Sequence, residues 1–214
     1  MLIDHVGYAF FPGELWLRMI GRLAFPIFAW FLAVGYQRTR NKMRYFLRLL
    51  VWGIIAQVPF SLLFHNASVY NGQTFLIGTN VLFTFCFAFA ALVLIEKAKD
   101  KKWIVQIISG IGVAVLATLA EIAKTDYGFY GVLTVVLIYV IKNKAAQVVS
   151  FSALTALFVI FMSMHPVQLL AVFALPLTWI KWPQQKRHYG IVKQLFYAFY
   201  PVHILIIWYI VTFL

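Results

Sequence analysis

The chain has 214 residues, of which 64% are hydrophobic and only 11% are charged. A soluble domain carries about 25% charged residues, so this composition excludes an ordinary soluble domain and indicates a multi-pass membrane protein. The formal net charge of +12 comes from cations in short segments between apolar runs. That pattern is typical of cytoplasmic loops, so we expect no nucleic-acid partner.

The apolar runs predict the helices. A helix needs about 20 residues to cross a bilayer. The first run, residues 1–11, is too short to cross alone and ends at Pro12 and Gly13. Eight further runs follow, at residues 15–36, 46–64, 80–95, 103–123, 132–141, 145–164, 167–182 and 193–214. The shortest of these, 132–141, should begin near Tyr127. We therefore predict one all-α domain over residues 1–214, a polytopic helix bundle of about nine hydrophobic elements: eight full spans and a short first helix.

The Lys and Arg residues lie in alternate connections between these runs. One set of connections contains Arg38 and Arg40, then Lys97, then Lys142, whereas the other set contains only Lys124. Cytoplasmic loops of membrane proteins are enriched in Lys and Arg. The asymmetry predicts a cytoplasmic amino terminus and a carboxyl terminus on the outer side.

The first hairpin combines an apolar sequence with five ionisable groups, namely Asp4, His5, Glu14, Arg18 and Arg22. A charged side chain at mid-membrane costs about 2.5–3.5 kcal/mol on insertion scales, so such groups are commonly functional. Arg18 and Arg22 are four residues apart and share a helix face. Their guanidinium groups suit phosphates or carboxylates, although Arg18 could equally extend to the outer interface.

Further polar side chains are predicted at the same depth. Tyr200 and His203 are three residues apart near the middle of the last run, whereas Asn80 and Asp126 lie at outer ends of other runs. Pro201 should free a backbone carbonyl in the preceding turn for a polar group in the bundle. A structural kink is an equally simple interpretation of that proline.

Asp4 and His5 are the pair with the most direct chemistry. A carboxylate can hold an imidazole in one tautomer, as a general base requires. Adjacent helical residues diverge by about 100°, however, so Asp4 could pair with Arg22 instead and leave His5 facing a cavity. A purely structural alternative is a buried, hydrogen-bonded His5 and an Asp4 ion pair. The five His residues show no metal-ligand spacing, so we expect no metal.

Several stretches of the chain resemble the TraX family: IDHVG, LRMIGRLAFPIFAWFLAVGY, DYGFYGVL and FYAFYPVHILII, with NVLFT as a fifth. This family is similar to the pilin N-acetylase of conjugative plasmids and to a broader set of membrane acyltransferases that includes heparan-α-glucosaminide N-acetyltransferase. The resemblance implies a bacterial inner-membrane acyltransferase that uses acetyl-CoA, with the histidine of the first helix, here His5, as the catalytic residue. Gln57 and Ser61 stand where the family pattern has acidic residues, and family members carry more apolar residues before the IDH motif.

Together these observations predict acyl transfer from cytosolic acyl-CoA to an amine or a hydroxyl. His5 would act as base and Asp4 would orient it, while Arg22 or Asn80 would donate to the developing oxyanion. The residues expected to bind the cofactor are Arg18, Arg22, Asn80, Arg38 and Arg40. Those expected along the acceptor path are Asp126, Tyr127, Tyr130, Tyr200 and His203.

The sequence leaves the acceptor open, since a pilin-like amine, a sugar or a small amine would suit these residues, and it leaves the oligomeric state open. Two rival functions also stand. Buried ionisable residues mark transport pathways as well, although an odd number of elements and the lack of repeated halves weigh against common transporters. The other rival is a non-enzymatic pilus or envelope assembly factor that holds the membrane helix of a client.

Overall fold

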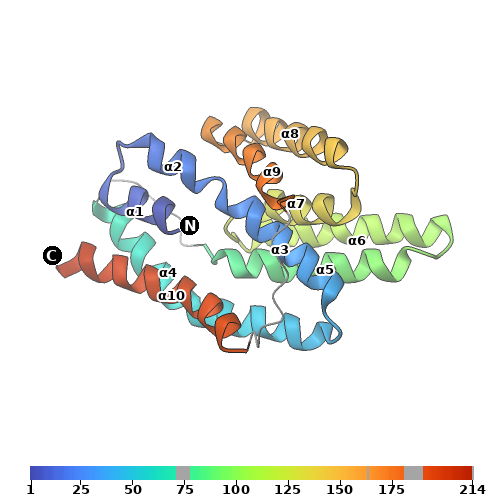
Figure 1. Cartoon of the computed structure of the whole chain (residues 1–214), viewed down its shortest axis with the longest axis horizontal. Helices are drawn as coiled ribbons and strands as arrows, with labels where there is room; N and C mark the ends of the chain where they lie inside the picture. Colours follow the sequence, from blue (N-terminus) through green and yellow to red (C-terminus); the bar gives the residue numbers. More distant parts are fainter. Residues whose placement is uncertain (71–77, 163, 181–189, 214) are drawn as a thin grey trace.

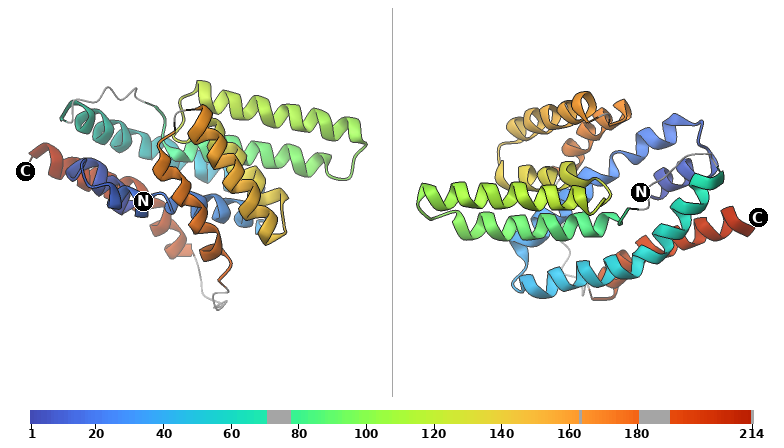
Figure 2. Two further views of the ribbon diagram at one scale, coloured as in Figure 1. Left: turned by 90° about the horizontal axis from the view of Figure 1, so that it is seen from above. Right: turned by 180° about the vertical axis from the view of Figure 1, so that it is seen from behind.

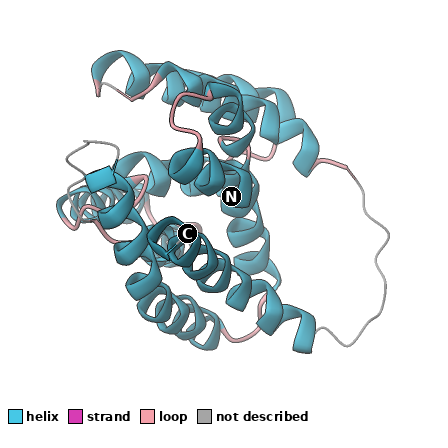
Figure 3. Ribbon diagram, turned by 90° about the vertical axis from the view of Figure 1, so that its left-hand side faces the viewer, coloured by secondary structure: helices cyan, strands magenta, loops and turns pink. Residues whose placement is uncertain are grey.

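The computed structural model describes residues 1–70, 78–162, 164–180 and 190–213, except for the side chains of 65–70 and 190–193. The prediction of an all-α fold is confirmed, and Figure 3 shows helices joined by loops. Within the described residues the only β pairing is an isolated bridge between Thr79 and Thr125.

The helices follow the chain in the order shown in Figure 1. They are α1 (Leu2–Phe10), α2 (Leu15–Gly21), α3 (Ala24–Arg38), α4 (Lys42–Tyr70), α5 (Val81–Ala98), α6 (Trp103–Ile122), α7 (Gly128–Val140), α8 (Lys144–Phe161), the 3-10 helix η1 (Pro166–Phe173), α9 (Ala174–Thr178) and α10 (Gly190–Phe213).

Six described segments are long and apolar enough to cross a membrane, where the sequence predicted eight. They are Leu15–Arg38, Lys42–Phe64, Val81–Ala98, Trp103–Ile122, Lys144–Phe161 and Gln194–Phe213. The two others are shorter. The helix α7 has 13 residues because it starts only after the irregular turn that ends at Tyr127. The segment Pro166–Thr178 is divided between η1 and α9, so it forms no single long α-helix.

The helices pack as neighbouring pairs around a common core. In the structure α4 lies along α10, α5 packs on α6 and α7, and α1 packs on α2. The hairpin of α5 and α6 extends past the other helices at one end (Figure 2). Large side chains from α3, α7 and α8 fill the core, including Phe25, Tyr36, Tyr130 and Phe151. Apolar side chains along α6, such as Ile108 and Ile111, are exposed, as lipid-facing residues are.

The connections alternate between the two ends of the bundle. Those joining α3 to α4, α5 to α6 and α7 to α8 lie at one end, which we call the basic end because it carries Arg38, Arg40, Lys99 and Lys142. The turn from α1 to α2 and the carboxyl terminus lie at the opposite end (Figure 1). The basic end is the end that the sequence assigns to the cytoplasm. Met1 lies within the bundle, between these two ends (Figure 1).

Asn80 fixes the start of α5 against α4. Its side-chain oxygen accepts a hydrogen bond from the Leu82 N–H at 3.1 Å. Its amide nitrogen donates to the Gly53 carbonyl at 2.8 Å and to Gln57 Oε1 at 2.9 Å. Because Asn80 is fully buried, these bonds lie in a medium where a missing partner is costly.

Replacing Asn80 by Ala should therefore destabilise the fold. Loss of a helix cap costs about 1 kcal/mol, and a buried polar group left unsatisfied costs about 1–3 kcal/mol. The thermal unfolding midpoint of the purified protein in detergent should fall by several degrees. Asn143→Ala is the matched control, because Asn143 also caps a helix, through the Ala146 N–H at 3.0 Å, but is exposed. Equal shifts in the two variants would contradict this role of Asn80.

Candidate active site

Two histidines from opposite ends of the chain meet in the core. His5 Nδ1 on α1 lies 2.9 Å from His203 Nε2 on α10, and the two rings are nearly parallel with centroids 5.1 Å apart. The side chains are 6% and 4% exposed, so water is largely excluded from the pair. The sequence placed both residues at the same depth but did not predict their contact.

The backbone sets the direction of this hydrogen bond. His203 Nδ1 lies 2.6 Å from the carbonyl oxygen of Phe199, and a carbonyl can only accept, so His203 carries its proton on Nδ1. In a neutral His203 ring, Nε2 is then an acceptor and must receive the proton of His5 Nδ1. His5 Nε2 is therefore left with a lone pair, as a general base requires.

The surroundings of the pair favour neutral rings. Phe64 contacts His5 edge-on with ring centroids 5.8 Å apart, and Phe199 stacks on His203 at 4.8 Å. Burial opposes a charged imidazole, and the positive charges of Arg18 and Arg22 near His5 act in the same sense. A proton gained by His5 would thus be held only briefly and passed on readily.

Asp4 belongs to a different cluster. Its carboxylate pairs with Arg18 at 3.2 Å and with Arg22 at 3.9 Å, and Arg18 also donates to the Asp4 carbonyl at 3.3 Å. Gly21 permits this approach of α1 to α2, because a Cβ at that position would collide with the Asp4 side chain. Of the two arrangements left open by the sequence, the structure has Asp4 paired with the arginines, and it is His203 that contacts the His5 ring.

Arg22 connects this cluster to the far side of the bundle. It donates to Gln168 Oε1 at 3.4 Å, and Gln168 Nε2 donates to the Tyr130 hydroxyl at 3.4 Å. Tyr130 in turn lies 3.1 Å from Thr155 Oγ1. Gln168 and Thr155 were not singled out from the sequence. The sequence signal for both was a polar residue within an apolar run. In the structure their side chains are only 2% and 0% exposed.

The turn before α7 faces the same arginine. Tyr127 adopts a left-handed backbone with φ of 69°, its ring stacks on Phe25 at 3.9 Å, and its hydroxyl and the Asp126 carboxylate interact with Arg22. Burial raises the pKa of the Asp126 carboxyl to about 6, while Arg22 acts in the opposite direction. Non-glycine residues in left-handed conformations are uncommon and are concentrated at functional sites.

A polar pocket of about 240 Å³ lies beside Arg18 and Arg22, and its lining includes Pro12 of the turn from α1 to α2, which is at the end opposite the basic loops (Figure 1). Its lining residues come from α1, α2 and the segment that starts η1: Gly7, Tyr8, Pro12, Leu15, Arg18, Arg22, His165 and Val167. The two guanidinium groups give this pocket donors for a polar ligand.

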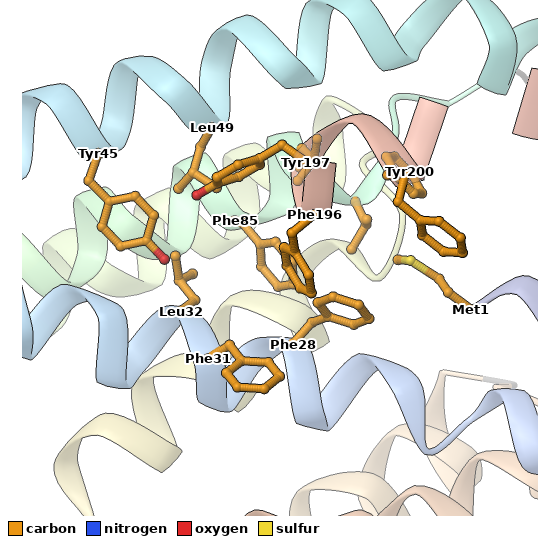
Figure 4. Close-up of a pocket in the computed structure, with 13 residues that line it drawn as sticks. Met1, Phe28, Phe31, Leu32, Tyr45, Leu49, Phe85, Phe196, Tyr197 and Tyr200 are labelled. Carbon is orange, nitrogen blue, oxygen red and sulfur yellow. The ribbon is translucent and has the colours of Figure 1, made fainter. Parts of the chain in front are cut away.

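A second cavity, of about 80 Å³ and almost entirely apolar, lies between α3, α4, α5 and α10 (Figure 4). Its lining is rich in aromatic side chains: Met1, Phe28, Phe31, Leu32, Tyr45, Leu49, Val81, Leu82, Phe85, Phe196, Tyr197, Phe199 and Tyr200. Met1 and Tyr200 lie at one end, while Tyr45 and Leu49, near the start of α4, lie at the other, towards the basic loops.

His5 lines neither cavity. Residues one turn away on α1 line both, Met1 the apolar cavity and Tyr8 the polar pocket. Among the described residues, these two spaces have no lining residue in common, and His5 lies along the chain between Met1, which lines one, and Tyr8, which lines the other.

The remaining predicted residues fall into two groups. Asn80 has both side-chain groups committed to α4 and α5, so it has no free donor for a ligand.

Arg38 and Arg40 are exposed at the basic end, away from the histidine pair. Arg48 is closer to the apolar cavity, with its guanidinium 5.7 Å from the Tyr45 ring centroid. The three-residue spacing of Tyr45 and Arg48 on one helix was the signal for that contact.

No three His, Cys, Asp or Glu side chains in the described ranges are grouped to hold a metal ion. The chemistry of this site thus consists of an imidazole pair, two arginines with their carboxylates, and several hydroxyl groups. Such a set can move protons and stabilise negative charge.

The chain is 30% identical over 221 residues to a "Probable fimbrial assembly protein FimC, serogroup H1" from Dichelobacter nodosus, which covers 95% of this chain and 88% of that protein. It is also 30% identical over 84 residues to the "Uncharacterized protein RP591" of Rickettsia prowazekii (strain Madrid E), covering 36% of this chain and 32% of that one. No solved structure matches the chain. Residues 1–211 match the family described as TraX protein, and the chain belongs to that family.

Proposed function

We propose that this protein is an acyltransferase of the bacterial inner membrane, which moves an acetyl or other short acyl group from cytosolic acyl-CoA to an amine acceptor. The observation that carries this proposal is the His5–His203 pair. Its hydrogen-bond direction leaves a basic lone pair on His5 Nε2 in the dry core of a membrane protein.

The apolar cavity supplies the donor route. It runs from Tyr45 near the basic end to Tyr200 beside the histidines, so a thioester arm entering from the cytosol would bring its carbonyl to His5. Its width suits a flexible chain more than a bulky head group, since the volume is about 80 Å³. Arg48, whose Nε is buried and has no hydrogen-bond partner among the described residues, would meet the polar part of CoA, together with the exposed Arg38 and Arg40.

The polar pocket supplies the acceptor route. Gly7 and Tyr8 of α1 line it, whereas Met1 lines the apolar cavity. Arg18 and Arg22 line the polar pocket as well. Tyr127 and Asp126 interact with Arg22, and Tyr130 is connected to it through Gln168. An amine with a neighbouring carboxylate or carbonyl group, as at the end of a peptide, would find donors here. A side-chain movement of α1 would have to join the two spaces during turnover.

The transfer itself needs one base. The acceptor nitrogen would attack the thioester carbonyl as His5 Nε2 takes its proton, and the hydrogen bond to His203 would stabilise the resulting imidazolium. Collapse of the tetrahedral intermediate would break the C–S bond, and His5 would return the proton to the leaving thiolate. One amide forms, one thioester is consumed and CoA leaves as a thiol.

A second candidate is a non-enzymatic assembly factor. It is favoured by the similarity to a relative whose name describes it as a probable fimbrial assembly protein. The two candidates differ in what they require of the core, because a scaffold needs no base at His5. Transport of a small polar solute would likewise need no acyl-CoA.

Acetyl transfer from labelled acetyl-CoA to peptide amines, by the purified protein in nanodiscs, tests the proposal. His5→Ala should lose about 10²–10⁴-fold in kcat, the usual contribution of a general base. His203→Gln removes only the partner that orients His5, so it should lower kcat more than it raises KM and should move the acid limb of the kcat/KM profile. Val202→Ala, an exposed neighbour on α10, is the control. Wild-type rates in His5→Ala would contradict the enzyme proposal.

The donor route makes a separate prediction. Leu49 is buried and lines the apolar cavity, so Leu49→Trp should occupy that space and reduce turnover of acetyl-CoA, with a larger effect for longer acyl chains. Val51→Trp introduces the same side chain two residues along α4, at a position that is 51% exposed, and should leave turnover unchanged. Equal rates in both variants would show that the donor enters elsewhere.

A further inference from the structure

One buried hydroxyl next to the histidine pair lacks a partner. Tyr200 is 6% exposed, and its hydroxyl has no hydrogen-bond partner among the described residues. A buried polar group in that condition costs about 1–3 kcal/mol, and in native structures it calls for an explanation. Packing alone does not explain a tyrosine here, because phenylalanine would fill the same space without the cost of burying an unpaired hydroxyl.

Tyr200 lies at the end of the apolar cavity that is nearest the histidine pair. Tyr200 lines the apolar cavity, and its ring centroid lies 6.4 Å from that of His5 and 5.9 Å from that of His203. A thioester carbonyl at this end of the cavity would lie beside Tyr200, and the histidine pair lies next to that residue.

A second donor approaches the same place. The Tyr200 hydroxyl lies near the backbone N–H of Val81, the first residue of α5, but the two groups are not aligned as a hydrogen bond. Asn80 caps the next N–H, that of Leu82, and its carbonyl accepts the one after, that of Phe83. First-turn N–H groups have no partner within their own helix, and the helix dipole favours negative charge at this end. Val81 also lines the cavity.

The residues expected from the sequence to stabilise an oxyanion are less suitable. Asn80 uses its amide on Gly53 and Gln57. Arg22 pairs with Asp4 and donates to Gln168. It lines the polar pocket and does not line the apolar cavity. Tyr200 and Val81 both line the apolar cavity, and they offer a hydroxyl and a backbone N–H as hydrogen-bond donors.

We propose that the Tyr200 hydroxyl, with the Val81 N–H, binds the oxyanion that forms on the thioester carbonyl carbon during acyl transfer. This inference rests on the proposed acyltransferase function and names a catalytic residue for it. As the acceptor nitrogen bonds to the carbonyl carbon, the C=O electron pair moves to oxygen, and both donors hydrogen-bond to it. When the C–S bond breaks, the carbonyl re-forms and the hydroxyl keeps its proton throughout.

Tyr200→Phe removes the hydroxyl and leaves the ring. In the acetyl-CoA assay we expect kcat to fall by about 10²–10³-fold, the usual cost of losing one oxyanion donor, with little change in the KM for acetyl-CoA. The thermal unfolding midpoint should stay the same or rise, because the lost group has no partner in the resting protein. Tyr209→Phe, on the exposed face of the same helix, is the matched control for both readouts.

Each outcome decides between the two proposals. Full activity of Tyr200→Phe in an active preparation would overturn the oxyanion role and leave the acyltransferase proposal standing. A lower unfolding midpoint with a raised KM would assign Tyr200 a structural role and also overturn it. A wild-type protein that transfers no acetyl group to amines or to water would overturn both.

Discussion

The site depends on one hydrogen bond whose direction is fixed by the backbone. The Phe199 carbonyl forces the proton of His203 onto Nδ1, and His203 Nε2 then takes the proton of His5 Nδ1. Nothing on the His5 side chain itself selects this tautomer. The first and last helices of the chain must therefore be packed together before a base exists, which makes the chemistry a property of the completed bundle.

A partly buried charge cluster supports that packing. Asp4 neutralises part of the charge of Arg18 and Arg22, and the three side chains are only 16%, 26% and 18% exposed, so solvent screens these pairs less than it screens surface pairs. The pairing fastens α1 to α2 one residue away from His5. Arg22 then continues through Gln168 to Tyr130, so the short first helix is tied to both halves of the fold while His5 points at α10.

Hydropathy and charge predicted the helical fold and the alternation of basic loops, since both follow from the chain's own composition. They overestimated the number of full spans. The start of α7 near Tyr127 was predicted, but an apolar run does not reveal that the segment from Pro166 begins as a 3-10 helix. The depth of His5 and His203 was predictable from topology. Their contact was not, because the direction of each side chain depends on the packing of α1 against α10.

The account is tested most directly by the protonation state of the two rings. Nitrogen NMR of the protein in nanodiscs, with labelled histidine and single-histidine variants for assignment, distinguishes protonated from unprotonated ring nitrogens. We expect His5 to be neutral with its proton on Nδ1, and a coupling from Nδ1 to His203 Nε2 across the hydrogen bond. A His5 ring protonated on Nε2, or one charged at neutral pH, would contradict the account, because it would leave no base in the core.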